Sequence, residues 1–201
     1  SMAEIIMESH IRSTVFEIFP TMVTTHDLST DPSFNVMRDV VNKTKTSEHA
    51  LMKNAESTYN ESTGNAWLDN VLLKDFKYLI QQCIDQYTQT YGLKQLRISN
   101  SWMNRIGLQG AVRPHRHEMS ALSGAFYPQA EPGSTPLILK NPTNSHKMYE
   151  IHTNETFFNA GQIEMECTVG QLILFPSWLE HYTEDNDTEN RVTVSFNTSY
   201  V

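Results

Sequence analysis

Hydrophobic residues follow two different spacings along the chain, and the spacing changes near residue 93. Before this point, apolar positions recur every three or four residues, as they do on one face of an amphipathic helix. After Gly92, short runs rich in β-branched and aromatic residues are separated by turn residues, as in β-strands. The pattern therefore predicts an α+β protein in which helices pack on one sheet of a β-sandwich.

Two helices are predicted in the first part of the chain. One begins at Asp31-Pro32, a cap followed by proline at the first helical position, and Phe34 starts its apolar face. Its end is placed only loosely, near Lys45. The second helix ends at Gly92, a typical helix-ending residue. Its apolar face consists of Leu72, Phe76, Leu79, Ile80, Cys83, Ile84 and Tyr87.

The strands are predicted between turn residues such as those at 131–133 and 141–142. They span residues 96–106, 120–127, 136–140, 171–175 and 191–200. No internal repeat, low-complexity stretch or linker interrupts the 201 residues. We therefore expect a single domain, residues 1–201, with a helical, bracing part at about 1–93 and a β-sandwich core at about 94–201.

Charge and composition narrow the possible functions. The formal net charge of −8 repels phosphate backbones at long range, so nucleic acid is not expected as a partner. No leader pattern opens the chain and no apolar run approaches the roughly 18 residues of a membrane span, which favours a soluble, cytoplasmic protein. Cys83 and Cys167 are interpreted as reduced thiols that pack as small hydrophobic residues.

Histidines are concentrated late in the chain. Five of the eight follow residue 114, and two of these lie in Pro114-His115-Arg116-His117. Side chains two apart on a strand point to the same face, so His115 and His117 can present two imidazoles to one ion. His181 is the best third candidate, because it follows a buried strand and a proline turn. Three ligands on one side of an ion leave the other positions open for substrates.

Two nearby carboxylates are alternative candidates for metal ligands. Glu118 follows His117, although on a regular strand it faces away from His115. Glu180 adjoins His181 and is another possible carboxylate ligand. We prefer three histidines, with Glu118 as the main rival; a His-x-His pattern by itself also fits two surface histidines.

A conspicuous arginine follows His181 by ten residues and begins an alternating strand. Arg191, Thr193 and Ser195 share one face of this strand, and the hydrophobic residues between them share the other. The polar face points either to solvent or inward. A buried guanidinium needs an anionic partner, and its planar fork fits a carboxylate. A dicarboxylate could then bind the metal with one end and Arg191 with the other.

Together these motifs resemble the double-stranded β-helix of the 2-oxoglutarate/iron(II) oxygenases, and more narrowly a group of oxygenases from marine bacteria and phages. The resemblance covers about residues 99–199 and, more weakly, Phe19-Pro20, and it implies a jelly-roll or cupin-like sandwich. The usual metal motif of the wider superfamily is His-x-Asp or His-x-Glu, from which His117 departs. The matching residues are Ser101-Trp102, His115-Arg116-His117, Leu122-Ser123-Gly124, Phe126-Tyr127, Phe175-Pro176-Ser177-Trp178-Leu179, His181 and Arg191 to Asn197.

The resemblance implies an activity and a set of cofactors. It predicts that iron(II) and dioxygen convert 2-oxoglutarate to succinate and carbon dioxide while a second substrate, a peptide or a small molecule, is hydroxylated. Ascorbate is a possible further cofactor, and prolyl or other peptide hydroxylation is the favoured reaction. Thr193, Asn104 and Tyr127 join Arg191 as candidates for the cosubstrate pocket. Trp102 and Tyr127 fit ordinary core packing equally well.

Two other functions remain compatible with the same residues. A three-histidine dioxygenase would bind its organic substrate directly and need no 2-oxoglutarate, with Arg191 holding the substrate's carboxylate. A metal-free binding or structural protein could use the same sandwich, because a fold does not fix a function. His146 and His152 lie in a loop-like stretch, where they are either exposed residues or part of a lid.

Overall fold

The computed structural model describes residues 2–6, 10–50 and 52–201 of the chain. Its two α-helices are α1 (Pro32–Lys43) and α2 (Lys74–Tyr91), and short 3₁₀ turns span Trp67–Asp69, Val71–Leu73 and Asn144–His146. The strands before α2 are β1 (Met2–Ile6), β2 (Arg12–Phe16), β3 (Thr24–Asp27), β4 (Ser47–Glu48) and β5 (Met52–Ser57). Those after α2 are β6 (Leu96–Val112), β7 (Leu122–Ala130), β8 (Leu137–Lys140), β9 (Gln162–Met165), β10 (Gln171–Pro176), β11 (His181–Tyr182) and β12 (Arg191–Tyr200).

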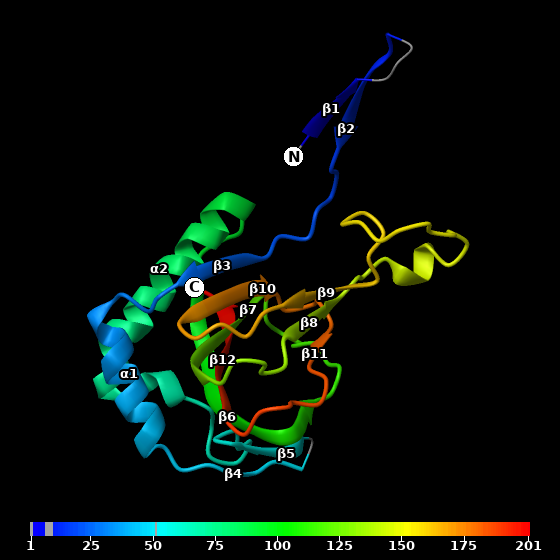
Figure 1. Cartoon of the computed structure of the whole chain (residues 1–201). Coiled ribbons are helices and arrows are strands. Elements are labelled where there is room, and N and C mark those ends of the chain that lie inside the picture. Colours follow the sequence, from blue (N-terminus) through cyan, green and yellow to red (C-terminus); the bar gives the residue numbers. More distant parts are fainter. Residues whose placement is uncertain (1, 7–9, 51) are drawn as a thin grey trace.

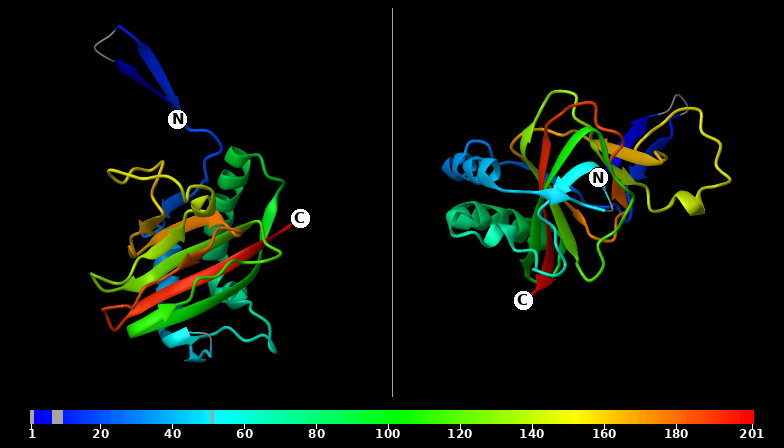
Figure 2. Two further views of the ribbon diagram at one scale, coloured as in Figure 1. Left: turned by 90° about the vertical axis from the view of Figure 1, so that its right-hand side faces the viewer. Right: turned by 90° about the horizontal axis from the view of Figure 1, so that it is seen from below.

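Two antiparallel sheets form a sandwich. The major sheet has the strand order β3-β10-β7-β12-β6-β5-β4, and the minor sheet has the order β11-β8-β9. Helices α1 and α2 lie together on one face of the major sheet, and the minor sheet lies across the opposite face (Figures 1 and 2). This arrangement is consistent with the predicted double-stranded β-helix braced by helices.

Side-chain alternation explains why the major sheet is covered on both faces. On β12, Val192, Val194 and Phe196 pack into the core that the sheet shares with the helices. On β10, Ile173 and Phe175 instead join a smaller core between the two sheets. Because successive side chains of a strand point to opposite faces, each strand of this sheet contributes to both layers. The face between the sheets also holds the polar residues of β12.

The helix boundaries follow local sequence signals. The Asp31 carboxylate caps α1 by accepting a hydrogen bond from the Ser33 N–H at 2.9 Å. At the other end, the Arg105 guanidinium donates to the carbonyl oxygens of Val41 and Thr44, at 2.6 and 3.1 Å. This cation satisfies carbonyls that a helix leaves free at its end. Helix α1 thus ends at Lys43, close to the predicted Lys45, and α2 ends at Gly92 as predicted.

The predicted boundary near residue 93 does not separate a helical part of the chain from a β-sheet part. Strands β3 and β5 come from the part that was predicted to be helical and bracing, yet both pair within the major sheet. Strand β5 has the sequence MKNAES, which contains no β-branched or aromatic residue that would signal a strand. Strands β9 and β11 were also not predicted, and they have only four and two residues. The first 93 residues therefore contribute strands as well as helices.

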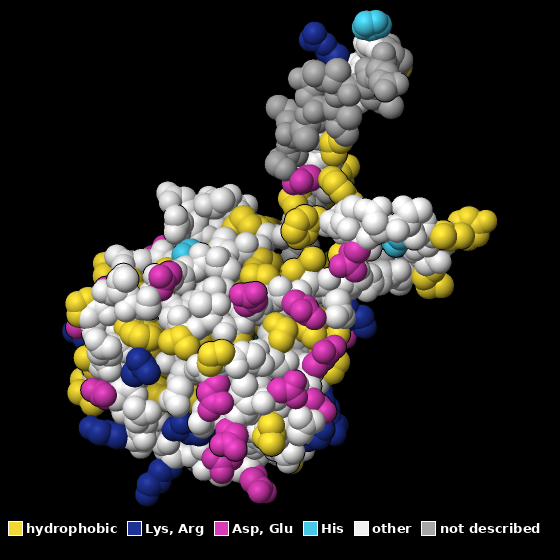
Figure 3. Space-filling view, viewed as in Figure 1, with side chains coloured by type: hydrophobic (Ala, Val, Ile, Leu, Met, Phe, Trp, Pro, Cys, Tyr) yellow, Lys and Arg dark blue, Asp and Glu magenta, His cyan; other side chains and the backbone are white. Residues whose placement is uncertain are grey.

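Two segments project from the sandwich. The hairpin β1–β2 forms its own two-stranded sheet and extends away from the rest of the chain (Figures 1 and 2). The connection between β8 and β9 also projects, and hydrophobic side chains gather on it (Figure 3). Tyr149 and Phe157 of this connection are more than nine-tenths exposed. Among the described helices, none is long and apolar enough to cross a membrane.

Gly124 is required by close packing at the centre of the major sheet. A Cβ atom built on Gly124 would lie 2.1 Å from the Phe196 ring, whereas one on the exposed Gly161 would meet no atom closer than 3.8 Å. We expect Gly124→Ala to lower the free energy of unfolding by about 1–3 kcal/mol through overpacking. Gly161→Ala, the control, should change it by no more than about 0.5 kcal/mol. Urea denaturation measures both, and equal stability of the two variants would contradict this account of Gly124.

Candidate metal centre and adjoining cavity

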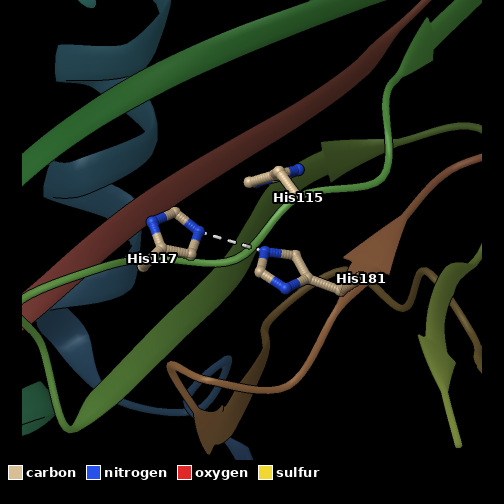
Figure 4. A group of neighbouring side chains, drawn as sticks. All are labelled: His115, His117 and His181. Carbon is tan, nitrogen blue, oxygen red and sulfur yellow. Dashed lines mark hydrogen bonds between the residues drawn. The ribbon is translucent and has the colours of Figure 1, made fainter. Parts of the chain in front are cut away.

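Three histidines converge between the two sheets. The segment after β6 pairs with β11 in an isolated antiparallel bridge, in which His115 and His181 exchange two backbone hydrogen bonds of 3.1 and 3.0 Å. The backbone N–H of His117 donates to the carbonyl of Ser177 at 3.0 Å. His115 and His117 therefore lie on a bridged loop and not on the regular strand that was expected. Both side chains still lie beside His181 (Figure 4).

The imidazole nitrogens are spaced for a shared ion. One nitrogen from each of the three rings can be chosen so that all lie within 4.8 Å of one another. Nε2 of His117 and Nε2 of His181 are 3.0 Å apart. Two nitrogens that each lie about 2.1 Å from one metal, at a right angle, would be separated by about 3.0 Å. This group of side chains could hold a metal ion.

Two of the rings are oriented by nearby backbone. Nδ1 of His115 lies 2.7 Å from the carbonyl oxygen of Arg113, and Nδ1 of His181 lies 2.8 Å from that of Leu179. A carbonyl oxygen only accepts hydrogen bonds, so the proton of each neutral ring is placed on Nδ1. The lone pair is then on Nε2. Hydrogen bonds of this kind commonly fix the tautomer and the orientation of metal-binding histidines.

Burial keeps the imidazoles neutral. Burial, together with a smaller effect of the neighbouring His115, lowers the pKa of His181 to about 3. Burial also lowers the pKa of His117 to about 4, again with a contribution from His115. A metal ligand must be deprotonated. At neutral pH these side chains are therefore in the form that binds a cation.

The two rival carboxylates lie outside the group. Glu118 is exposed in a turn and is not among the side chains that converge. The carboxylate of Glu180 points to surface cations, with one oxygen 3.6 Å from Arg116 and the other 3.5 Å from Lys140. Among the residues that the structure describes, the only cluster of three possible metal ligands is the histidine group.

Arg191 carries a buried positive charge. It is 2% exposed, and its Nε donates to the carbonyl oxygen of Thr135 at 2.8 Å. Nη1 donates to the Thr193 hydroxyl at 3.0 Å, and Nη2 lies 3.5 Å from the Tyr127 hydroxyl. No carboxylate of the described residues lies within 4.0 Å of the guanidinium. The polar face of β12 is thus turned inward, and its cation has no ionic partner there.

The surroundings of Arg191 do not supply the missing negative charge. Complete burial raises the pKa of Tyr127 to about 12, although the nearby Arg191 opposes the shift. Burial likewise raises the pKa of Cys167, which packs against the same core as Tyr127, and Arg191 again opposes the shift. Both groups are therefore neutral near pH 7. The site retains a net positive charge that an anion could neutralise.

A single cavity connects the histidines with Arg191. Its volume is about 70 Å³, several times the roughly 10–15 Å³ that one water molecule requires. Asn104, Thr193 and Trp102, which were candidates from the sequence, lie on its wall together with Tyr127. Asn104 is 9% exposed, and its Oδ1 accepts a hydrogen bond from the Ser57 hydroxyl at 2.6 Å. The sequence candidates are thus brought together around one space.

His146 and His152 lie apart from this cavity. They belong to the projecting connection between β8 and β9, and neither is among the cavity-lining residues. His152 lies 2.8 Å from the Glu150 carboxylate. The structure therefore places them away from the histidine group.

No pattern in the sequence predicted the residues that support Arg191. Asn186 is completely buried, and its Oδ1 accepts a hydrogen bond from the Thr135 N–H at 3.0 Å. Its Nδ2 donates to the carbonyl oxygen of Thr188 at 2.8 Å. Because the Thr135 carbonyl in turn accepts from Arg191, Asn186 holds the backbone that orients the guanidinium. The contacts of Thr135 with Asn186 and with Arg191 join residues more than 50 positions apart, which no local pattern reveals.

Comparison with known proteins identifies the fold. Residues 100–197 match the model of a family described as "Putative 2OG-Fe(II) oxygenase". HygX from Streptomyces hygroscopicus, solved with nickel and 2-oxoglutarate bound, superposes with a TM-score of 0.63 at 10% identity, over 90% of this chain and 84% of that chain. An oxidoreductase of the 2OG-Fe(II) oxygenase family from Burkholderia pseudomallei gives 0.62 at 8% identity, over 88% and 84%. A prolyl-4-hydroxylase from Pseudomonas putida gives 0.58 at 10% identity, over 90% and 94%. No curated protein matches the sequence.

The sandwich is therefore a double-stranded β-helix, as predicted. The region that matches the family, residues 100–197, contains all three histidines and Arg191. This part of the chain matches the 2-oxoglutarate/iron(II) oxygenases, a family of enzymes, in agreement with the resemblance found in the sequence. The narrower likeness to oxygenases of marine bacteria and phages stays a prediction.

Removing the Asn186 side chain should destabilise the fold. Asn186→Ala leaves the buried Thr135 N–H without its partner, and we expect the free energy of unfolding to fall by about 1–3 kcal/mol. Asn190→Ala is the matched control, because this exposed side chain makes one hydrogen bond of 3.1 Å, to Glu131. Thermal and urea unfolding of both variants would measure the difference. An Asn186→Ala protein as stable as the control would show that the buried contacts of Asn186 contribute little.

Proposed function

We propose that the chain is a non-haem iron(II) oxygenase that uses 2-oxoglutarate and dioxygen to hydroxylate a peptide or a small molecule. One observation carries this proposal: a single cavity joins three converging neutral imidazoles to a buried guanidinium that has no carboxylate partner among the described residues. A cation site and an anion site at opposite parts of one cavity suit a ligand that has two different acidic ends.

His115, His117 and His181 would hold the metal. Three ligands from one group of side chains would leave the other positions of the ion open for cosubstrate and dioxygen. Three neutral ligands leave the ion with its full double charge. A 2-oxoglutarate dianion would offset most of the positive charge of the ion and Arg191, with one acidic end at the metal and the other at the guanidinium. When bound, iron and 2-oxoglutarate supply the oxidising chemistry, and the protein fixes geometry and excludes water.

Arg191 would bind the far carboxylate of 2-oxoglutarate. Its guanidinium is held in place by the Thr135 carbonyl and the Thr193 hydroxyl, so little conformational freedom is lost on binding. The Tyr127 hydroxyl and the amide nitrogen of Asn104 are additional donors on the same wall. The Asn104 amide N–H groups have no hydrogen-bond partner among the described residues, so they are available to a ligand.

The prime substrate is proposed only by class. The structural neighbours include a prolyl-4-hydroxylase and HygX, whose structure was also solved with hygromycin B bound, so this fold serves both peptide and small-molecule chemistry. Hydroxylation of a peptidyl proline is the favoured candidate for this chain. Purified iron-loaded protein supplied with candidate peptides, and mass spectrometry for a gain of one oxygen atom, would test it.

A three-histidine dioxygenase without 2-oxoglutarate is the second candidate. The observation that favours it is the absence of a carboxylate from the converging group, within the described part of the chain. Succinate discriminates between the two functions. The proposed oxygenase releases succinate from 2-oxoglutarate in an iron- and oxygen-dependent manner, whereas the alternative releases none while oxidising its own substrate.

Loss of one histidine should remove the metal without unfolding the chain. We expect His181→Ala to bind no stable iron(II), because the ion would keep only two protein ligands. Glu118→Gln is the control, since Glu118 lies outside the group, and its iron content should equal that of the parent. Metal analysis after gel filtration measures both. A large loss of iron in Glu118→Gln would restore a carboxylate ligand, and full iron content in His181→Ala would remove His181 from the ligand set.

Arg191 should control cosubstrate binding and not metal binding. Removing one partner of a buried charge pair costs about 2–5 kcal/mol, so Arg191→Met should weaken 2-oxoglutarate binding by roughly 30-fold or more. Arg191→Lys should lie between the parent and Arg191→Met, because lysine keeps the charge but loses the planar fork. Anaerobic titration of the metal-loaded protein measures the affinity.

The exposed Arg116 provides the matched control for this titration. Arg116→Met also removes a positive charge, yet the Arg116 side chain is 64% exposed and pairs only with Glu180 at 3.6 Å. Its 2-oxoglutarate affinity should stay within about threefold of the parent, a change of under about 0.7 kcal/mol. If Arg191→Met binds as tightly as Arg116→Met, the cosubstrate pocket lies elsewhere.

A further inference from the structure

A row of aromatic side chains leads from the outside of the sandwich to the histidine group. The His49 and Tyr59 rings have centroids 5.6 Å apart, and those of Tyr59 and Trp102 are 5.4 Å apart. The Trp102 ring lies 5.8 Å from that of His117. His117 is one of the three proposed metal ligands, so the row ends at the metal position.

The residues of this row differ in burial. His49 and Tyr59 are half-buried, whereas Trp102 is 9% exposed and lines the cavity. Tyr59 therefore contacts solvent on one side and the indole of Trp102 on the other. The row connects the surface with the interior through two residues, Tyr59 and Trp102, whose side chains are among the most easily oxidised in proteins.

The backbone holds this row firmly. The Tyr59 N–H donates to the Ser57 hydroxyl at 2.9 Å, and the residue before it, Thr58, exchanges hydrogen bonds with Met103. Met103 adjoins Trp102 on β6, so the segment carrying Tyr59 is tied to the strand carrying the indole. The two rings meet edge to face, with 79° between their planes. Their contact is thus a fixed feature of the fold.

We propose that Tyr59 and Trp102 form an electron-transfer path that returns the metal centre to iron(II) when 2-oxoglutarate is consumed without a prime substrate. This inference rests on the proposed function. Its purpose would be protection, because oxidising equivalents that are not passed to a substrate would otherwise attack the histidines and the cavity wall. The terminal reductant would be a small water-soluble donor of hydrogen atoms, of the ascorbate type.

The electrons and protons of this path balance. Consumption of one 2-oxoglutarate and one dioxygen without a prime substrate would leave one oxygen atom and two oxidising equivalents to be consumed. Two electrons and two protons would convert that oxygen atom to water and leave the metal as iron(II). Each electron passes from the Trp102 indole to the centre, and Tyr59 then refills the indole and releases its phenolic proton to water. A hydrogen atom from the external reductant restores the Tyr59 phenol, and water delivers the protons to the centre.

Two other aromatic residues at the site, Tyr127 and Phe175, are poorly placed for this role. Tyr127 lines the same cavity but is completely buried, so an external reductant does not reach it. The Phe175 ring meets the His181 ring edge to face, with centroids 4.7 Å apart, yet a phenylalanine ring is far harder to oxidise. Within the described part of the chain, the row through Tyr59 combines oxidisable rings, a contact with the metal ligands and access to solvent.

Conservative substitutions separate electron transfer from packing. Tyr59→Phe and Trp102→Phe keep an aromatic ring in each position but remove its ready oxidation. Tyr78→Phe is the control, because Tyr78 is 66% exposed on α2 and is not part of the row. Melting temperature and iron content would first confirm that each variant folds and binds metal. Tyr59→Phe should also keep the 2-oxoglutarate affinity of the parent.

The primary measurement is the tyrosyl radical, detected by electron paramagnetic resonance. Iron(II)-loaded full-length protein is mixed with 2-oxoglutarate and dioxygen without prime substrate, and samples are frozen at successive times. We expect a tyrosyl signal in the parent and in Tyr78→Phe, and at least a tenfold lower signal in Tyr59→Phe and in Trp102→Phe. Ascorbate should remove the signal. Mass spectrometry should find at least threefold more oxidation of peptides containing His115, His117 and His181 in Tyr59→Phe.

A second oxidant keeps the test independent of the proposed cosubstrate. Hydrogen peroxide added to the iron(II)-loaded protein oxidises the centre without 2-oxoglutarate, and the same radical at Tyr59 is expected. If the protein forms no succinate but peroxide still produces a Tyr59 radical, the proposed function is wrong and the electron-transfer path is retained. Succinate formation with no Tyr59-dependent radical under either oxidant would overturn the path and retain the function. A protein that binds no iron would overturn both.

Discussion

The buried charge of Arg191 is the constraint on which the organisation of the interior depends. An uncompensated cation between two sheets costs several kcal/mol, so the protein keeps it only with extensive hydrogen bonding. Thr135 and Thr193 satisfy part of the guanidinium, and Asn186 fixes the backbone of Thr135. None of them neutralises the charge. Under the proposed function, a carboxylate bound beside the guanidinium would offset the remaining cost through charge-assisted hydrogen bonds.

The same strand alternation that buries Arg191 made much of the fold predictable. On β12 the hydrophobic positions 192, 194 and 196 belong to the helix-covered core, so the alternate positions must face the other layer. The polar side chains of β12 are buried only because the minor sheet covers that face of the major sheet. The resemblance to a double-stranded β-helix supplied that second sheet, while the pattern of β12 alone left the direction of the stripe open. The helices were predictable for a simpler reason, since α2 has a regular apolar face and ends at Gly92.

Interactions between distant segments were beyond prediction from the sequence. Strand β5 pairs with β6 although its own residues favour no strand, because the neighbouring strand supplies the hydrogen bonds. The contact of Tyr59 with Trp102 and that of Asn186 with Thr135 each join residues more than 40 positions apart. For the histidines, the sequence indicated the right residue types, but it placed His115 and His117 on a regular strand. Their convergence with His181 results from an isolated bridge, which has no sequence signature.

The histidine group is largely organised by local contacts. The Nδ1 atoms of His115 and His181 bond the carbonyl oxygens of Arg113 and Leu179, each two residues earlier in the chain. The rings are thus oriented by short-range hydrogen bonds, and the backbone pairing of the two histidines brings them together. Because these contacts lie within the chain, we expect folding not to depend on the proposed metal, in contrast to small domains that fold only around their ion. Under the proposed function, a substitution in the histidine group would then remove the ion and leave the sandwich intact.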